Sequence, residues 1–409
     1  MRGIISAEKR LWGALSMVLV VLLLFGACAT PSTPGEEKKV VEFGDITPLT
    51  GAVSSSEQAT VKGRTDYVKY FNEIEGIPGV AVKHSWIDIG LSVSMGMSAY
   101  RRFVERGVPV LTSSYTTVLE PLKPQLAVDE IPVAIGLQDE PLFYPPGWVY
   151  GAAPTYAETF TALADYIMEN WKQERPPRLA FVIVDSVYGW APVGEGTKYA
   201  ESIGIEMLPV EMVPYMVIDA TPQLLRLDER GADFVYVMGL APTAGPMLRD
   251  AERLGLLDKI NFCGAESTAG EMLINMAGDA AEGYMFPKVL PWIDETDITG
   301  IKLMVDNQMK WYGKVHKENP YVIGWVDTAR ICEGIRRAVD TVGYENINGP
   351  AVKAAFDGMK DYDTYGIVNI TYTPEDHRGS DMVAVYQVKD GKIVRVSDWR
   401  HAPMLVPDK

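Results

Sequence analysis

The chain has 409 residues, of which 47% are hydrophobic and 22% are charged, and its formal net charge is −16. This length accommodates two domains of ordinary size, and the composition is that of a well-packed globular protein. With 54 acidic and 38 basic residues, the chain does not favour a partner such as nucleic acid, whose phosphates require a basic face.

The first 27 residues are predicted to be a signal peptide. Basic residues among the first ten positions flank an uncharged run, LWGALSMVLVVLLLFGAC, and a proline-rich spacer follows it. The run ends in Gly-Ala-Cys, which resembles the bacterial lipobox, so we predict lipidation at Cys28 and a tether over 28–39. The protein would then be anchored by lipid in the periplasm or on the outer face of the cell membrane. An uncleaved transmembrane anchor is the alternative, because the run is near the ~18 residues that a span needs.

Strand-like and helix-like stretches alternate from residue 40 onward. Apolar strands are predicted in VVEFGDI, GVAVKHSWI, VPVL and IPVAIG, and a helix is predicted over 92–106. The alternation then restarts with a helical stripe from Phe160 to Trp171 and with the buried strands RLAFVIV, DFVYVMG and INFCG. A long helix includes 331–342, and strands in VNITY, MVAVYQV and KIVRV end the chain. This order predicts an α/β protein with two doubly wound parallel-sheet lobes, which bind ligands outside the carboxyl ends of their strands.

Signatures of catalysis and of tightly bound cofactors are missing from the sequence. There is no GxGxxG after a strand, no GxxxxGK[ST] loop and no GxSxG elbow. Cys263 and Cys332 have no second Cys or His at metal-ligand spacing and are predicted to be buried free thiols; a disulfide between them is the alternative, because an exported chain could oxidise them. We therefore predict no enzyme activity, no cofactor and no metal. The four histidines are far apart in the sequence: His84, His316, His377 and His401.

One acidic residue stands at the end of a predicted buried strand. The stretch FCGAES, residues 262–267, closes the apolar run INF and contains Glu266, with no lysine or arginine close in sequence. A solvated loop acid or a helix N-cap is one interpretation. The other is that this carboxylate binds a positively charged group of a ligand in a cleft, where the low dielectric strengthens the pair.

Several stretches, in this order, resemble one known family. They are GDITPLTGA, FVIVDSVYGWAP, GADFVYVMG, PMLRDAERLGL, INFCGAES and MAGDAAEGY. The chain resembles the solute-binding proteins of ABC importers, specifically the branched-chain amino acid (leucine/isoleucine/valine-binding) family with the type I periplasmic fold. The resemblance implies three crossovers between the lobes and a hinge that closes them on the ligand. Lobe 1 would contain 40–154 and 289–366, and lobe 2 would contain 155–288 and 367–409.

The resemblance also implies roles for individual residues. Glu266 matches the lobe 2 acid that binds the ammonium group of an amino acid, and Tyr188 matches an aromatic residue that packs on the ligand. The loop LTSSYTTV corresponds to a segment whose hydroxyl groups and helix N-terminal amides bind the ligand carboxylate, which assigns Ser114 and Thr116. A turn residue at Tyr188 and simple helix capping by Ser114 and Thr116 are the structural alternatives.

The next loop departs from the family pattern. Leu137, Gln138 and Asp139 fall at ligand-facing positions, and an acid at this place would repel a ligand carboxylate. Either Asp139 points away, or the ligand is not a simple α-amino acid. Trp325, before a helix expected at 327, falls near a family aromatic residue at the cleft mouth, with core packing as the alternative.

These observations predict a lipid-anchored binding protein of an ABC importer. It would capture a small amine-bearing solute, such as an amino acid or a relative, by lobe closure and deliver it to permease subunits. Amides and aromatic acids remain alternative ligands, since the lobe 1 features leave that end of the ligand open. A sensor or regulatory lipoprotein of the same fold and an exported hydrolase are the alternative classes of function.

Overall fold

The computed structural model describes residues 39–51 and 53–406. The predicted signal peptide, Cys28 and nearly all of the predicted tether lie outside these residues. Within the described part, no helix combines the length and the apolar character that crossing a membrane would require.

The first sheet has the strand order β2-β1-β3-β4-β5, in which β1, β3, β4 and β5 run parallel. Successive side chains of a strand face opposite sides, so Val110 and Ala134 pack in one hydrophobic cluster while Leu111 and Val133 pack in another. The elements of this part are β1 (Lys39–Thr47), α2 (Ser54–Glu73), β2 (Val80–Asp88), α3 (Val93–Glu105), β3 (Leu111–Thr112), α4 (Thr116–Asp129), β4 (Val133–Ala134), α5 (Glu140–Phe143) and β5 (Val149–Tyr150).

The second sheet repeats this winding, with the order β15-β14-β10-β9-β8-β6-β7. Strands β6 to β10 pair in parallel, and β14 adds antiparallel to β10. The elements are α6 (Tyr156–Asn170), β6 (Arg178–Val184), α7 (Val187–Trp190), α8 (Val193–Ser202), β7 (Glu206–Val213), α9 (Thr221–Glu229), β8 (Phe234–Met238), α10 (Ala241–Arg253), β9 (Asn261–Gly264), η1 (Glu266–Thr268), α11 (Glu271–Ala277), η2 (Gly278–Ala281), β10 (Met285–Lys288), β14 (Met382–Lys389), β15 (Lys392–Arg395) and β16 (Arg400–His401).

The segment between β10 and β14 packs largely on the first sheet. Tyr372 and His377, in β12 and β13, contact the Tyr150 ring at centroid distances of 5.0 and 4.3 Å. These strands therefore lie with the first sheet, whereas the predicted boundary assigned residues from 367 onward to lobe 2. The elements are α12 (Thr299–Tyr312), α13 (Asn319–Val342), η3 (Tyr344–Asn346), α14 (Gly349–Asp357), β11 (Tyr362–Asp363), β12 (Asn369–Thr373) and β13 (Asp376–Gly379).

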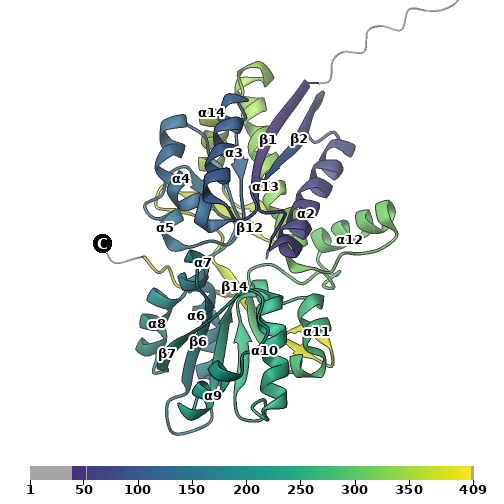
Figure 1. Ribbon diagram of the computed structural model, residues 1–409. Coiled ribbons are helices and arrows are strands. Elements are labelled where there is room, and N and C mark those ends of the chain that lie inside the picture. Colours follow the sequence, from purple (N-terminus) through teal and green to yellow (C-terminus); the bar gives the residue numbers. More distant parts are fainter. Residues whose placement is uncertain (1–38, 52, 407–409) are drawn as a thin grey trace, which may run out of the picture. The chain divides into compact units, whose positions relative to one another are not determined.

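Helices α2 and α13 lie side by side through two glycines (Figure 1). A Cβ atom on Gly63 would lie 2.1 Å from the carbonyl oxygen of Tyr321, and one on Gly324 would lie 2.1 Å from that of Thr60. Both oxygens belong to the backbone, so a side chain at either position would push the helices apart. The approach places the first turn of α2 beside the start of α13, and both contribute residues to the site described below.

We expect Gly324→Ala to lower the free energy of unfolding by about 1–3 kcal/mol, because an added methyl group cannot fit between the helices. The control is Gly194→Ala in α8, where nothing lies within 4 Å of the added Cβ atom. That variant should be stabilised by ~0.5–1 kcal/mol, since alanine is the better helix former. Urea unfolding curves measure both changes, and equal midpoints for the two variants would contradict this account of the α2–α13 contact.

Candidate functional site

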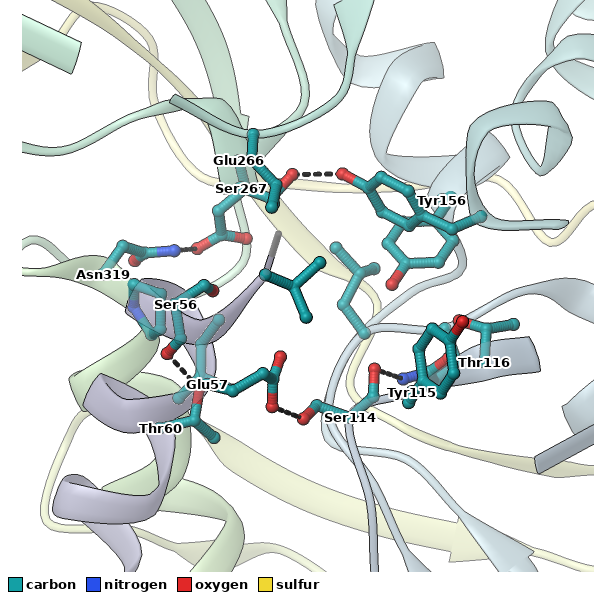
Figure 2. Close-up of a pocket in the computed structure, with 18 of the residues that line it drawn as sticks. Ser56, Glu57, Thr60, Ser114, Tyr115, Thr116, Tyr156, Glu266, Ser267 and Asn319 are labelled. Atoms are coloured by element: carbon teal, nitrogen blue, oxygen red, sulfur yellow. Dashed lines mark hydrogen bonds between the residues drawn. The ribbon is translucent and has the colours of Figure 1, made fainter. Parts of the chain in front are cut away.

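A cavity of about 130 Å³ lies where the carboxyl ends of the two sheets meet α2 and α13 (Figure 2). In both sheets the winding reverses beside the strand that comes first in the chain, and ligands of open α/β sheets bind at such points. Loops after β3, β4, β6, β7, β8 and β9 all supply residues. The lining residues are Val53, Ser56, Glu57, Thr60, Ser114, Tyr115, Thr116, Gly136, Leu137, Gln138, Tyr156, Tyr188, Tyr215, Leu240, Glu266, Ser267, Asn319, Pro320, Ile323 and Asp327.

The wall next to the first sheet carries hydroxyl and amide groups in a connected network. The Thr116 hydroxyl donates to Oε1 of Gln138, whose Nε2 donates to the Ser114 carbonyl at 3.3 Å. The Ser114 hydroxyl donates to Oε2 of Glu57, and the Thr47 hydroxyl donates to the same oxygen at 3.1 Å. The resemblance pointed to Ser114 and Thr116 but not to Glu57, which sequence analysis missed.

Glu57 lies in the first turn of α2 and is 9% exposed. Burial raises the pKa of its carboxyl group, although the hydrogen bond from Ser114 and the charge of Arg64 oppose the shift. A buried carboxyl group with a raised pKa can hold its proton and donate a hydrogen bond. An acidic side chain therefore stands in the part of the cavity where the resemblance implied a loop that binds the ligand carboxylate.

The wall next to the second sheet is built around Glu266, which is 2% exposed. Its Oε1 atom accepts hydrogen bonds from Nζ of Lys288 and from Nδ2 of Asn319, both at 2.9 Å. The backbone N–H of Val289 donates to Oε2 at 3.3 Å. Lys288 also donates to Oδ1 of Asn319, so the three side chains form a closed triangle.

Glu266 therefore has a cation partner within the protein, although no lysine or arginine is close to it in sequence. Lys288 is fully buried and ends β10, the strand next to β9, so it reaches Glu266 from 22 residues further along the chain. Glu266 still lines the cavity, but its charge is balanced by the protein itself. What Glu266 offers a ligand is a hydrogen-bond acceptor in a neutral ion pair rather than an uncompensated charge.

Four tyrosines give the cavity an aromatic lining: Tyr115, Tyr156, Tyr188 and Tyr215. The Tyr188 hydroxyl donates to the Gly239 carbonyl at 2.8 Å and contacts the Ser267 hydroxyl. The rings of Tyr156 and Tyr188 meet edge to face, with centroids 5.1 Å apart. Sequence analysis named Tyr188 but missed Tyr156, which no motif marks because it begins α6 with ordinary helical periodicity.

Leu137 and Gln138 line the cavity, but Asp139 does not. Asp139 is the N-cap of α5, and its Oδ1 atom accepts a hydrogen bond from the Glu140 backbone N–H at 3.0 Å. Burial and the hydrogen bond with Asp139 raise the pKa of Glu140 to about 9. Asp139 therefore does not face the cavity, which is compatible with the first of the two interpretations of this acid.

Trp325 is also absent from the lining, which corrects its assignment to the cleft mouth. Helix α13 begins at Asn319, with Pro320 in its first turn, so Trp325 lies inside the helix rather than before it. Its ring is buried and stacks on Tyr70 at a centroid distance of 5.8 Å, and it meets Tyr67 edge on. Core packing between α2 and α13 accounts for this residue.

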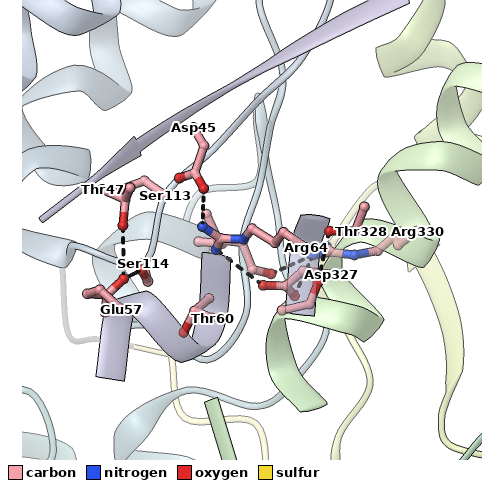
Figure 3. A network of polar contacts seen from close by, with 12 residues as sticks. Asp45, Thr47, Glu57, Thr60, Arg64, Ser113, Ser114, Asp327, Thr328 and Arg330 are labelled. Carbon is pink, nitrogen blue, oxygen red and sulfur yellow. Dashed lines mark hydrogen bonds and ion pairs between the residues drawn. The ribbon is translucent and has the colours of Figure 1, made fainter. Parts of the chain in front are cut away.

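A buried network of charged groups adjoins the cavity and shares Asp327 with its lining (Figure 3). Arg64 binds Asp45 at 2.8 Å and lies 3.6 Å from Asp327, which also pairs with Arg330 at 3.2 Å. Burial acts to raise the pKa of Asp45, but Arg64 and His84 outweigh it and the pKa falls. For Asp327, which lines the cavity, burial prevails and the pKa rises.

No further candidate site for metal binding or thiol chemistry is present among the described residues. They contain no group of three or more His, Cys, Asp or Glu side chains placed to hold a metal ion. Cys263 and Cys332 are both buried free thiols, as predicted. Burial raises the pKa of each thiol, which keeps it in the unreactive protonated form.

Comparison with known proteins identifies relatives in sequence and in structure. A family model described as periplasmic binding protein matches residues 40–392. The Leu/Ile/Val-binding protein of Escherichia coli (strain K12) is 35% identical over 130 residues, which cover 31% of this chain and 33% of that protein. The Leu/Ile/Val-binding protein homolog 1 of Brucella abortus (strain 2308) is 25% identical over 58% of this chain and 64% of that protein. The chain thus spans about a third of the length of the first of these curated relatives.

Solved structures match over most of the chain. A branched chain amino acid ABC transporter protein from Thermus thermophilus with bound valine has a TM-score of 0.83 and 27% identity, covering 89% of this chain and 97% of that one. A fatty acid ABC transporter substrate-binding protein from Thermomonospora curvata has a TM-score of 0.77 at 18% identity, covering 90% and 94%, which shows the fold alone. The predicted fold class, two doubly wound lobes of the type I periplasmic binding protein fold, is confirmed by these matches.

Proposed function

Because the chain belongs to the periplasmic binding protein family, we propose that it is the lipid-anchored, extracytoplasmic solute receptor of an ABC importer. In this function it captures a small solute by closure of its two lobes and delivers it to permease subunits. The observation that carries the proposal is the cavity at the carboxyl ends of both sheets. The lining combines apolar and aromatic side chains with hydroxyl, amide and carboxyl groups that can orient a small molecule, and this function breaks no bond in the solute.

The solute we propose carries an N–H group, as an amine or an amide. Glu266 keeps lone pairs for such a donor, since the one bond that its Oε2 atom accepts among the described contacts is the long bond from Val289. The tyrosines and Leu137, Leu240 and Ile323 surround an apolar body.

Uptake measurements test the function. Deletion of the gene should abolish uptake of one small solute, and the same solute should raise the unfolding temperature of the purified protein. Ligand that binds only the native state adds ~2.7 kcal/mol to stability at a hundred times its dissociation constant. A deletion strain with normal uptake of every solute that stabilises the protein would contradict the proposal.

Cell fractionation tests the anchor. Cys28→Ser should move the protein from the membrane fraction to the soluble fraction, because the acylated residue is lost. Thr33, in the same predicted tether, offers the control Thr33→Ser, which should leave the protein with the membrane. A Cys28→Ser protein that stays in the membrane would point to the alternative of an apolar run that spans it.

A further inference from the structure

The end of the cavity next to the first sheet presents a carboxyl group directly to the solute. Glu57 uses its Oε2 atom to accept from Thr47 and Ser114. Figure 2 shows its other oxygen directed toward the middle of the cavity. The side chain is nine-tenths buried, so this oxygen faces the solute's space rather than bulk water.

The charges around the cavity do not suit an anionic solute. Three carboxyl groups line the cavity, from Glu57, Glu266 and Asp327, and no lysine, arginine or histidine is among the described lining residues. The two nearby cations are already engaged: Lys288 with Glu266, and Arg64 with Asp45. A carboxylate placed beside Glu57 would lose its hydration without gaining a cation, and burying a charge in that way is costly.

The same groups fit an uncharged carboxamide. A protonated Glu57 donates to a carbonyl oxygen, and burial, which raises the pKa of this carboxyl group, favours the protonated form. The Ser114 hydroxyl donates to Glu57 and keeps its own oxygen lone pairs for an N–H of the solute. A primary amide carries this acceptor and this donor on one carbon atom.

We propose that Glu57 and Ser114 bind the carboxamide group of the solute, so that the protein transports small aliphatic or aromatic amides in preference to the corresponding carboxylic acids. This inference rests on the proposed function and specifies its substrate class. In this proposal, Glu57 makes the cavity select an amide over a carboxylate. It does so at the end of the cavity where the resemblance implied binding of the ligand carboxylate.

Matched pairs of solutes test the proposal. The purified protein is titrated calorimetrically at neutral pH with 4-methylpentanamide and 4-methylpentanoate, phenylacetamide and phenylacetate, and leucinamide and leucine, up to millimolar concentrations. In at least one pair the amide should bind, with an affinity about tenfold or more above that of the acid. Acids that bind as tightly as their amides, or no amide that binds at all, would overturn the proposal. The uptake experiment judges the transport function separately, since a protein that imports an acid would lose this inference and keep that function.

Two variants locate the preference. Glu57→Leu removes the carboxyl group that donates to the amide carbonyl oxygen, so the ratio of amide to acid affinity should fall toward one, whereas the same change at the exposed Glu282 should leave the ratio unaltered. Ser114→Ala removes the acceptor for the amide N–H and should weaken the amide more than the acid. Circular dichroism confirms that each variant is folded. An unchanged ratio in both Glu57→Leu and Ser114→Ala would contradict the assignment.

Discussion

Replacing Lys288 with methionine is expected to lower the free energy of unfolding by about 3–5 kcal/mol. Methionine nearly matches the length of the lysine stem, so the main loss is the cation. Glu266, 2% exposed, would then keep a buried negative charge, and its remaining hydrogen-bond partners among the described residues would be Asn319 and the Val289 N–H. The double variant Lys288→Met/Glu266→Gln should recover much of this loss, because no charge is left unpaired.

Lys302→Met is the matched control for Lys288→Met. Lys302 binds Asp306 at 2.6 Å, a shorter contact than the 2.9 Å pair of Lys288, but both side chains of this control pair are about 60% exposed. An exposed pair contributes ~0–1 kcal/mol, so Lys302→Met should change the urea midpoint little. Equal losses for the two variants would mean that the Lys288–Glu266 pair is not buried as described.

Replacing Arg64 with methionine is expected to have a similarly large effect, about 3–5 kcal/mol. Arg64 is fully buried and lies between Asp45 of β1 and Asp327 of α13, so its loss leaves two buried acids without their shared cation. Arg330 still pairs with Asp327, but no second arginine reaches Asp45 among the described contacts. Only His84, at 2.9 Å, remains beside Asp45.

Arg336→Met is the matched control for Arg64→Met. Arg336 also pairs with two acids, Glu333 and Asp340, but it is 36% exposed on α13 and should lose ~1 kcal/mol or less. Denaturant unfolding monitored by circular dichroism measures both variants. If Arg64→Met unfolds at the midpoint of Arg336→Met, the network does not hold β1, α2 and α13 together.

Strands β6 and β8 of the second sheet could be predicted from the sequence because they are buried on both faces. RLAFVIV corresponds to β6 at Arg178–Val184, and FVYVM corresponds to β8 at Phe234–Met238. Continuous apolar runs of this kind can be recognised as strands without any knowledge of their neighbours.

The start of α13 was predicted too late, because Pro320 and Gly324 suggest a break in the helix. In the structure, proline occupies the first turn of this helix, and Gly324 allows the close approach of α2.

The candidate site could be predicted in outline, since strand ends can be located from a sequence. Six of the eight residues named for the ligand line the cavity: Ser114, Thr116, Leu137, Gln138, Tyr188 and Glu266. What could not be predicted are the partners from distant segments. Glu57 resembles any acid in the first turn of a helix, and its role depends on Ser114, 57 residues away. Lys288 offered one signal, a lysine at the end of the apolar strand MFPK, but nothing in the sequence shows that β9 and β10 are neighbours.

The most direct test of the account is a crystal structure of the protein with the solute that its uptake assay identifies. We predict electron density for that solute in the cavity between the two sheets, with an uncharged carboxamide group within hydrogen-bond distance of Glu57 and Ser114. The Lys288–Glu266 pair should remain intact in that structure. Density for the solute at any other place, or a solute carboxylate in contact with Glu57, would contradict the account.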